Sequence, residues 1–243
     1  MPLPQGTVQV WRASIAGIEA RETLWRTALS PEELERARRF RSSERRRQFL
    51  GGRVLLRMAL GACLQCEPAS VCLSVDADGK PALRKTEFPL DITVSISHSG
   101  DLALCVLGRG RAVGIDVEKV VERSHLPRVA RRLFTPSECA AWSALPEDQR
   151  LAGFYRCWTS KEAYLKALGD PRRSLMAEVE TEADPMAPAV QVRTIGEGAR
   201  RRMWTFHSFA PAEGYLATAV AEGDAPQWAF VEAFAPLTGE ALP

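Results

Sequence analysis

The stretch from residue 92 to residue 118 constrains the fold most, because three strand-like runs follow one another there with only short turns between them. Apolar and polar side chains alternate over residues 92–97 and 111–118, and residues 102–107 are apolar throughout. Such patterns are typical of strands with one or both faces buried. We therefore expect three consecutive strands in an antiparallel meander. Further strand-like runs lie at residues 7–18, 71–75, 189–192, 203–208, 215–220 and 228–231.

Helical patterns precede and follow these strands. Ser30, Pro31 and Glu33 have the types expected at a helix start: a capping serine, a proline in the first turn and a capping-box glutamate. Apolar residues then recur at helical spacing. Two later helices are expected over residues 137–142 and 154–168, the second ended by a glycine.

Each half of the chain thus combines helices with short strands. This pattern predicts an α+β fold with two related lobes, residues 1–110 and residues 111–243. The self-similarity of the two halves is too weak at the level of residues to define a sequence repeat.

Composition excludes several classes of protein. The 243 residues carry 32 basic and 30 acidic side chains, a net charge of +2 that argues against a general nucleic-acid coat. No run approaches the roughly 20 apolar residues that span a bilayer, and the first residues lack a signal-peptide pattern. Of the six cysteines, Cys63 and Cys66 form one CxxC with no second pair at zinc-finger spacing. We expect free thiols, a cytoplasmic location and no membrane partner.

Two carboxylates stand out in the last of the three central strands. On a strand, alternate side chains share a face, so Gly114, Asp116 and Glu118 point together, away from the apolar residues between them. Two carboxylates about 7 Å apart repel each other unless a cation lies between them. Hard oxygen ligands of this kind suit Mg²⁺. The alternative is a solvated strand face, because acids are common on exposed strands.

A helix near residue 160 carries a second group of candidates. Trp158, Glu162 and Lys166 are spaced i, i+4 and i+8 and share one face. Lys161 lies beside them, so this helix holds two of only five lysines in the chain. Glu162 could complete a magnesium site with the strand carboxylates, or it could form an ordinary exposed pair with Lys166.

Three further features could bind an anion. Ser97 and His98 end a strand and offer hydrogen-bond donors, or they belong to a polar hairpin turn. Lys80 follows a turn and is equally compatible with an ordinary loop. Residues 31–57 contain nine arginines and four glutamates, including Arg36 and Arg53, and form a local positive region. No Walker A loop, dinucleotide fingerprint or nucleophile elbow is present.

Taken together, six motifs in this order resemble the 4′-phosphopantetheinyl transferase family, and within it the larger, surfactin-synthetase-activating (Sfp-like) type. They extend over most of the chain, and the last two are the family's signature. The motifs are Ser-Pro-Glu and Arg-Arg-Phe within 30–40, Gly-Arg-Val-Leu-Leu-Arg at 52–57, Gly-Lys-Pro at 79–81, Ser-His-Ser at 97–99, Gly-Ile-Asp-Val-Glu at 114–118, and Trp-Thr-Ser-Lys-Glu at 158–162 with Lys166.

The resemblance implies two similar lobes related by a pseudo-twofold axis, with coenzyme A and Mg²⁺ between them. It implies transfer of the phosphopantetheine arm of coenzyme A to a serine of an apo carrier protein, with release of adenosine 3′,5′-bisphosphate. The carrier belongs to fatty-acid, polyketide or peptide synthesis. Matched position by position, the magnesium ligands are Asp116, Glu118 and Glu162, and the coenzyme contacts are Arg36, Arg53, Lys80, Ser97, His98 and Lys166.

Roles within the reaction follow from the same resemblance. We expect Glu162 to accept the serine proton, directly or through a metal-bound water. Lys166 is expected to neutralise or protonate the departing bisphosphate, and Lys161 to position either the helix or a phosphate. Two positions depart from the family's prototype: Glu33 stands in place of a lysine, and Phe49 in place of a small polar residue.

Other functions share part of this pattern. A Mg²⁺-dependent nucleotide transferase acting on a small molecule would use the same carboxylates without a protein partner. A non-catalytic coenzyme A-binding module would need only the binding positions. Nucleic-acid binding through residues 36–57 lacks any recognised module, and we expect no nucleic-acid partner. Two lobes in one chain would make a monomer sufficient.

Overall fold

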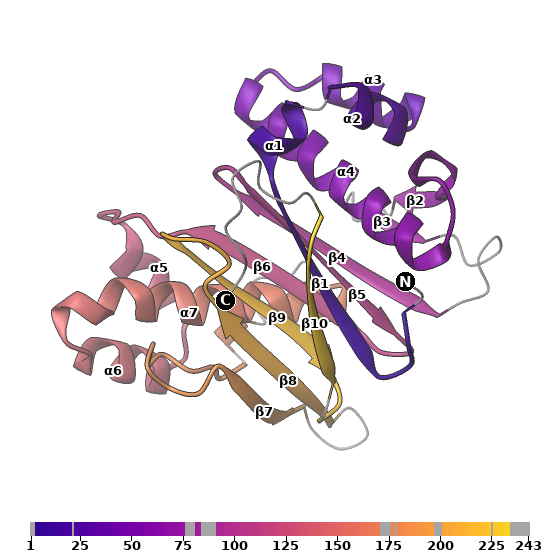
Figure 1. The fold of residues 1–243 in the computed structure, drawn as a ribbon. Coiled ribbons are helices and arrows are strands. Elements are labelled where there is room, and N and C mark those ends of the chain that lie inside the picture. Colours follow the sequence, from indigo (N-terminus) through magenta and orange to yellow (C-terminus); the bar gives the residue numbers. More distant parts are fainter. Residues whose placement is uncertain are drawn as a thin grey trace. The chain divides into compact units, whose positions relative to one another are not determined.

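The computed structural model describes residues 3–20, 22–75, 81–83, 91–170, 176–177, 179–196, 201–224 and 226–233. The chain divides into two compact units, one made of residues 1–110 and 227–243 and the other of residues 111–226. Both units combine a sheet with helices, which confirms the α+β class (Figure 1).

The first unit is built on a four-stranded sheet with the order β10-β1-β5-β4. β1 is Thr7–Ser14, β4 is Ile92–Ser99, β5 is Leu102–Arg109 and β10 is Gln227–Glu232. The short helices α1 (Ile15–Glu19), α2 (Glu22–Ala28) and α3 (Pro31–Arg38) lead into the long helix α4 (Ser43–Leu64). After it come η1 (Pro68–Ser70) and a two-stranded sheet of β2 (Leu73–Val75) and β3 (Pro81–Leu83).

Helix α4 is held against this sheet by its apolar face. Val54, Leu56 and Leu60 are fully buried and belong to one core with Cys105 and Leu107 of β5. Removing such side chains from water stabilises the packed helix by about 1.5–3 kcal/mol for each large aliphatic residue. The core therefore fixes which face of α4 remains outside it.

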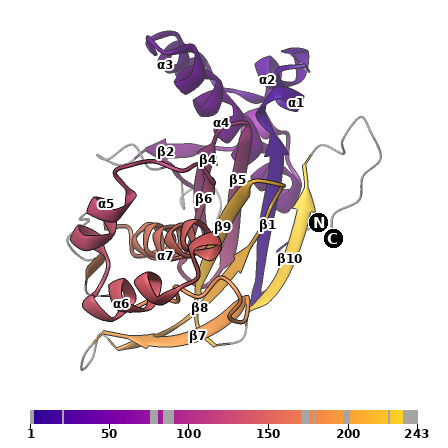
Figure 2. The same ribbon diagram turned by 90° about the vertical axis from the view of Figure 1, so that its left-hand side faces the viewer.

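The second unit has its own four-stranded sheet, in the order β6-β9-β8-β7. β6 is Val113–Lys119, β7 is Val190–Ile195, β8 is Arg202–Phe209 and β9 is Tyr215–Glu222. The long helix α7 (Glu147–Leu168) packs against β6 and β9. Figure 2 shows α5 (Leu126–Leu133) and α6 (Pro136–Ala144) beside α7, with which they share an apolar cluster.

A glycine allows α7 to approach β6 closely. A Cβ atom built on Gly114 would lie 1.9 Å from the carbonyl oxygen of Ala163 and 2.6 Å from the amide nitrogen of Ala167. No side chain fits in that space. Gly114 therefore sets the distance between the strand and the helix that carry the signature motifs.

The long helices of the two units have similar surroundings. α4 and α7 each contain 22 residues and end on a left-handed residue, Gln65 (φ 56°) or Gly169 (φ 69°). The helices α3 and α6 that precede them both begin with a serine or threonine cap, a proline and a capping-box glutamate, Glu33 or Glu138. The structure thus reveals a local likeness between the halves that the sequence did not.

Two expectations about connectivity need correction. β4 and β5 form the expected antiparallel hairpin, but β6 pairs with β9 and not with β5, so the three strands are no meander. β10 pairs in parallel with β1, so the last strand belongs to the first unit and not to the second lobe as expected. In both cases the strand was recognised and its distant partner was not, because pairing over long sequence separations leaves no local pattern.

No helix among the described residues has the length and apolarity needed to cross a membrane.

Candidate active site

Asp116 and Lys166 are joined directly in the second unit. The Lys166 Nζ donates to Asp116 Oδ1 at 2.6 Å, with Asp116 almost fully buried and the lysine side chain 29% exposed. Asp116 comes from β6 and Lys166 from the last turn of α7. The two signature motifs therefore meet, and they meet as an acid and a base with access to solvent on one side.

The other two acids of the predicted magnesium site lie on the same strand and the same helix as this pair. Glu118 lies two residues after Asp116 on the same face of β6 and is half-buried. Glu162 is half-buried on α7 and precedes Ala163, the residue that meets Gly114. As the side chains stand, no three acidic, histidine or cysteine residues of the described part converge closely enough to form a metal site.

Hydroxyl groups connect α7 to β9 behind this pair. Thr218 lies opposite Asp116 in the β6–β9 ladder and is fully buried. Its Oγ1 is 2.9 Å from the Thr159 hydroxyl, 3.2 Å from that of Ser160 and 3.1 Å from that of Ser208. The network fixes the middle of α7 to the sheet, and sequence analysis missed it because its members come from three elements.

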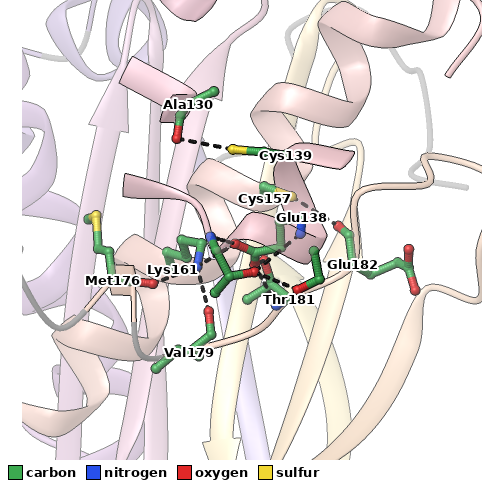
Figure 3. Close-up of polar contacts among 11 residues, drawn as sticks. Ala130, Glu138, Cys139, Cys157, Lys161, Met176, Val179, Thr181 and Glu182 are labelled. Atoms are coloured by element: carbon green, nitrogen blue, oxygen red, sulfur yellow. Dashed lines mark hydrogen bonds and ion pairs between the residues drawn. The ribbon is translucent and has the colours of Figure 1, made fainter. Parts of the chain in front are cut away.

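Lys161 points into the interior and not toward this face. Its Nζ bonds Glu138 Oε2 at 2.8 Å and the carbonyl oxygens of Met176 and Val179 (Figure 3). A lysine has three donors, and these partners occupy all of them. Of the two roles expected for Lys161, the geometry favours positioning the helix and leaves no donor for a phosphate. Glu138 was recognised only as part of a helix start.

In the first unit, the predicted coenzyme contacts Arg36 and Arg53 both lie near one aromatic ring. Their guanidinium carbons are 5.3 and 5.4 Å from the centroid of Phe49, within the range of cation–π attraction. Arg36 is exposed, whereas Arg53 is only 3% exposed. Burial lowers the pKa of Arg53, an effect that the charge of Glu33 opposes.

The two departures from the family's prototype belong to this same cluster. Glu33 bonds Arg57 at 2.6 Å and lies 3.9 Å from Arg53, so it holds two guanidinium groups in place. Phe49 provides the ring against which Arg36 and Arg53 lie. The acid at the position of the prototype's lysine is thus paired with Arg57 and lies near Arg53.

Ser97 and His98 lie on opposite faces of β4. The alternation of a strand places His98 with Ile96, and both lie within 3.7 Å of a Cβ built on Gly52 of α4. Ser97 is buried on the other face. His98 therefore lies beside Gly52 of α4, the residue before Arg53. Ser97 lies on the other face of β4. The remaining predicted contact, Lys80, lies outside the described residues.

Comparison with known proteins gives consistent matches along the chain. Residues 112–220 match the 4′-phosphopantetheinyl transferase superfamily, and residues 16–108 match the N-terminal region of 4′-phosphopantetheinyl transferases. The chain is 39% identical over 182 residues to the 4′-phosphopantetheinyl transferase HetI of Nostoc sp., covering 75% of this chain and 76% of that one.

Two further relatives are more distant. The 4′-phosphopantetheinyl transferase Sfp of Bacillus subtilis is 32% identical over 141 residues, which cover 58% of this chain and 60% of that one. The crystal structure of Helicobacter pylori holo-[acyl-carrier-protein] synthase with coenzyme A aligns with a TM-score of 0.35 at 20% identity, covering 43% of this chain and 100% of that one.

Proposed function

The chain belongs to the 4′-phosphopantetheinyl transferase family, and from this premise we propose that it transfers the phosphopantetheine arm of coenzyme A to a serine hydroxyl of an apo carrier protein. The other product is adenosine 3′,5′-bisphosphate. The observation that carries the proposal is the Asp116–Lys166 contact of 2.6 Å, because it joins the family's two signature motifs in one partly open site.

The donor set of this site is compatible with Mg²⁺. Asp116, Glu118 and Glu162 offer only hard carboxylate oxygens, the ligands that Mg²⁺ prefers. Asp116 already binds the ammonium of Lys166, so this face of β6 attracts positive charge. We assign the three acids as its ligands. When bound, Mg²⁺ would withdraw charge from the pyrophosphate oxygens of the coenzyme.

Side chains of this chain can accept the serine proton and neutralise the departing bisphosphate. The serine oxygen forms a bond to the β-phosphorus of coenzyme A, and the bond from that phosphorus to the bridging oxygen breaks. Glu162 accepts the serine proton, as a general base. The Lys166 ammonium neutralises the charge that develops on the departing bisphosphate. An ammonium already held beside Asp116 needs little reorganisation to do so.

We assign coenzyme binding outside this site to the arginine cluster of the first unit. Arg36 and Arg53 with Phe49 combine two cations and one ring, which suits a phosphate next to a planar base. His98 lies beside the same helix. Ser97 and Lys80 are further proposed contacts from the family pattern.

The partner and the setting follow from the reaction. The proposed partner is an apo carrier protein of fatty-acid, polyketide or peptide synthesis, and two units in one chain make a monomer sufficient. All six cysteines are free thiols, which is compatible with the reducing cytoplasm, where we place the protein.

Intact mass spectrometry of carrier proteins tests the proposal. Apo carriers from fatty-acid, polyketide and peptide synthases are incubated with the protein, coenzyme A and Mg²⁺, and EDTA serves as the control. We expect a metal-dependent gain of one phosphopantetheine arm on at least one carrier. No gain on any carrier despite coenzyme A binding would favour a non-catalytic binding module. No gain and no coenzyme binding would overturn the proposal.

A further inference from the structure

Glu138 and Lys161 form an ion pair inside the second unit, separate from the Asp116–Lys166 pair. The distance from Lys161 Nζ to Glu138 Oε2 is 2.8 Å, and the two side chains are 0% and 1% exposed (Figure 3). Burial lowers the pKa of Lys161, and the charge of Glu138 opposes that change. A pair so completely removed from water is costly unless its remaining donors and acceptors are also satisfied.

Those donors and acceptors connect three segments of the chain. Glu138 accepts from the N-cap amide of α6 at 2.7 Å, and from the amide and hydroxyl of Thr181 at 2.6 and 2.7 Å. Lys161 donates to the carbonyl oxygens of Met176, at 2.5 Å, and of Val179. The pair therefore ties α7 both to the start of α6 and to the segment that follows α7.

The position of Lys161 on α7 makes these buried bonds relevant to the candidate active site. Glu162 is the next residue, and a helix turns by about 100° for each residue. A rotation of α7 by one position would bring Lys161 to the place of Glu162 and would move Lys166 away from Asp116. The buried bonds of Lys161 oppose that rotation, because it would leave a buried ammonium without partners.

We propose that the buried Glu138–Lys161 pair is a positioning device, which fixes the rotation of α7 so that Glu162 and Lys166 face the carboxylates of β6. Neither residue contacts the reacting atoms. The prediction for turnover rests on the proposed function, whereas the prediction for the mobility of α7 does not.

Replacing both partners separates positioning from stability. Lys161→Met alone leaves a buried carboxylate without its cation, so we expect lower thermal stability and a kcat reduced about tenfold or more. Adding Glu138→Gln removes that charge and keeps an acceptor for the N-cap amide, but its NH2 group cannot accept from the Thr181 amide. The double variant should regain part of the lost thermal stability while its kcat stays low, because Met176 and Val179 still lack their donor. A double variant with recovered kcat would overturn the proposal.

The first unit offers a matched control. Arg57 on α4 pairs with the capping-box Glu33 as Lys161 pairs with Glu138, but no proposed catalytic group follows it. Arg57→Met should lower thermal stability like Lys161→Met and leave kcat within about twofold of the wild type. The kcat is measured at saturating coenzyme A, because Arg57 shares Glu33 with the proposed coenzyme contact Arg53. An equal loss of kcat in this control would mean that any loss of stability lowers turnover, and would contradict a positioning role.

Amide hydrogen exchange gives a readout that needs no activity. Glu138→Gln alone keeps an acceptor for the N-cap amide but leaves the buried Lys161 ammonium without its carboxylate, so the double variant is the one least expected to impair folding. We expect faster exchange over residues 160–167 of α7 in the single variant and in the double variant, with residues 147–155 unchanged. Unchanged exchange along all of α7 would overturn the proposal. If the wild type labelled no carrier, the proposed function would fail while this exchange experiment would still decide the role of the pair.

Discussion

The helix pairs α3–α4 and α6–α7 have the same arrangement, yet only the second carries residues of the candidate active site, Glu162 and Lys166. In each pair, the capping-box glutamate of the short helix bonds the fifteenth residue of the long helix, Arg57 at 2.6 Å or Lys161 at 2.8 Å. Both cations also donate to backbone carbonyls of the segment that follows the long helix.

The difference lies in the positions that follow this cation. In α7 the sixteenth and twentieth residues are Glu162 and Lys166, whereas in α4 they are Met58 and Ala62. The first unit instead has Arg53 near an aromatic ring. With the proposed roles, the same scaffold supports two tasks: anion binding in the first unit, and proton acceptance and charge neutralisation in the second.

The largest effect should come from the sixteenth position. Glu162→Gln removes the proposed base at almost constant volume, so kcat should fall by about 10²–10⁴-fold while coenzyme A binding is largely kept. The matched change Met58→Leu in α4 should leave kcat within about twofold. Steady-state transfer rates and calorimetric binding of coenzyme A measure the two quantities. Near-normal turnover of Glu162→Gln would remove its assigned role.

The twentieth position should come next. Lys166→Ala removes the cation beside Asp116, and kcat should fall by about 10²-fold, as for the loss of one stabilising donor. Lys166→Arg should not restore the rate, because a planar guanidinium differs in shape from an ammonium. Ala62→Ser in α4 is the control and should have no effect on kcat. Full rescue by arginine would show that charge alone suffices.

Alanine substitutions at Gly114 of β6 and at Gly52 within α4 should change the thermal stability in opposite directions. Gly114→Ala would push a Cβ to within 1.9 Å of the Ala163 carbonyl, so it should destabilise the protein by about 3 kcal/mol and lower Tm by about 6–12 °C. Gly52→Ala meets only ordinary contacts at 3.6 and 3.7 Å. It should stabilise α4 by up to about 1 kcal/mol. Thermal unfolding measures both, and a stable Gly114→Ala variant would show that α7 can move away from β6.

The smallest effect should come from the first unit. Arg53→Met keeps most of the packing volume but removes a cation near Phe49, so the KM for coenzyme A should rise about tenfold, or about 1.4 kcal/mol. The kcat should change little. Saturation kinetics with coenzyme A, compared with a desphospho analogue that lacks the 3′-phosphate, shows whether Arg53 acts on that group. A fall in kcat without a change in KM would contradict the assignment of Arg53 to coenzyme binding.

The sequence predicted much of the candidate active site because its signals are local. Alternation placed Asp116 and Glu118 on one face of a strand. Helical spacing placed Glu162 and Lys166 on one face of a helix. The contact of 2.6 Å between Asp116 and Lys166 confirms that the two elements meet. The opposite faces of Ser97 and His98 could also have been predicted from alternation.

Other features depend on partners that no local pattern reveals. Lys161 lies beside Glu162 in sequence, but its direction is decided by Glu138, 23 residues earlier, and by carbonyl groups of residues 176 and 179. β10 joins β1 across most of the chain length. Such tertiary pairings override local propensity, so the motif was found while the role of one member was left open.

In the proposed reaction, the phosphopantetheine arm is transferred to a carrier serine in the same step that releases adenosine 3′,5′-bisphosphate. This central claim is tested most directly by measuring, in the same reaction, the adenosine 3′,5′-bisphosphate released and the mass gained by the carrier. The account predicts one bisphosphate for each phosphopantetheine arm attached, and neither product when EDTA is present. Bisphosphate release without a gain in carrier mass would indicate hydrolysis or transfer to a small molecule, and would contradict the account.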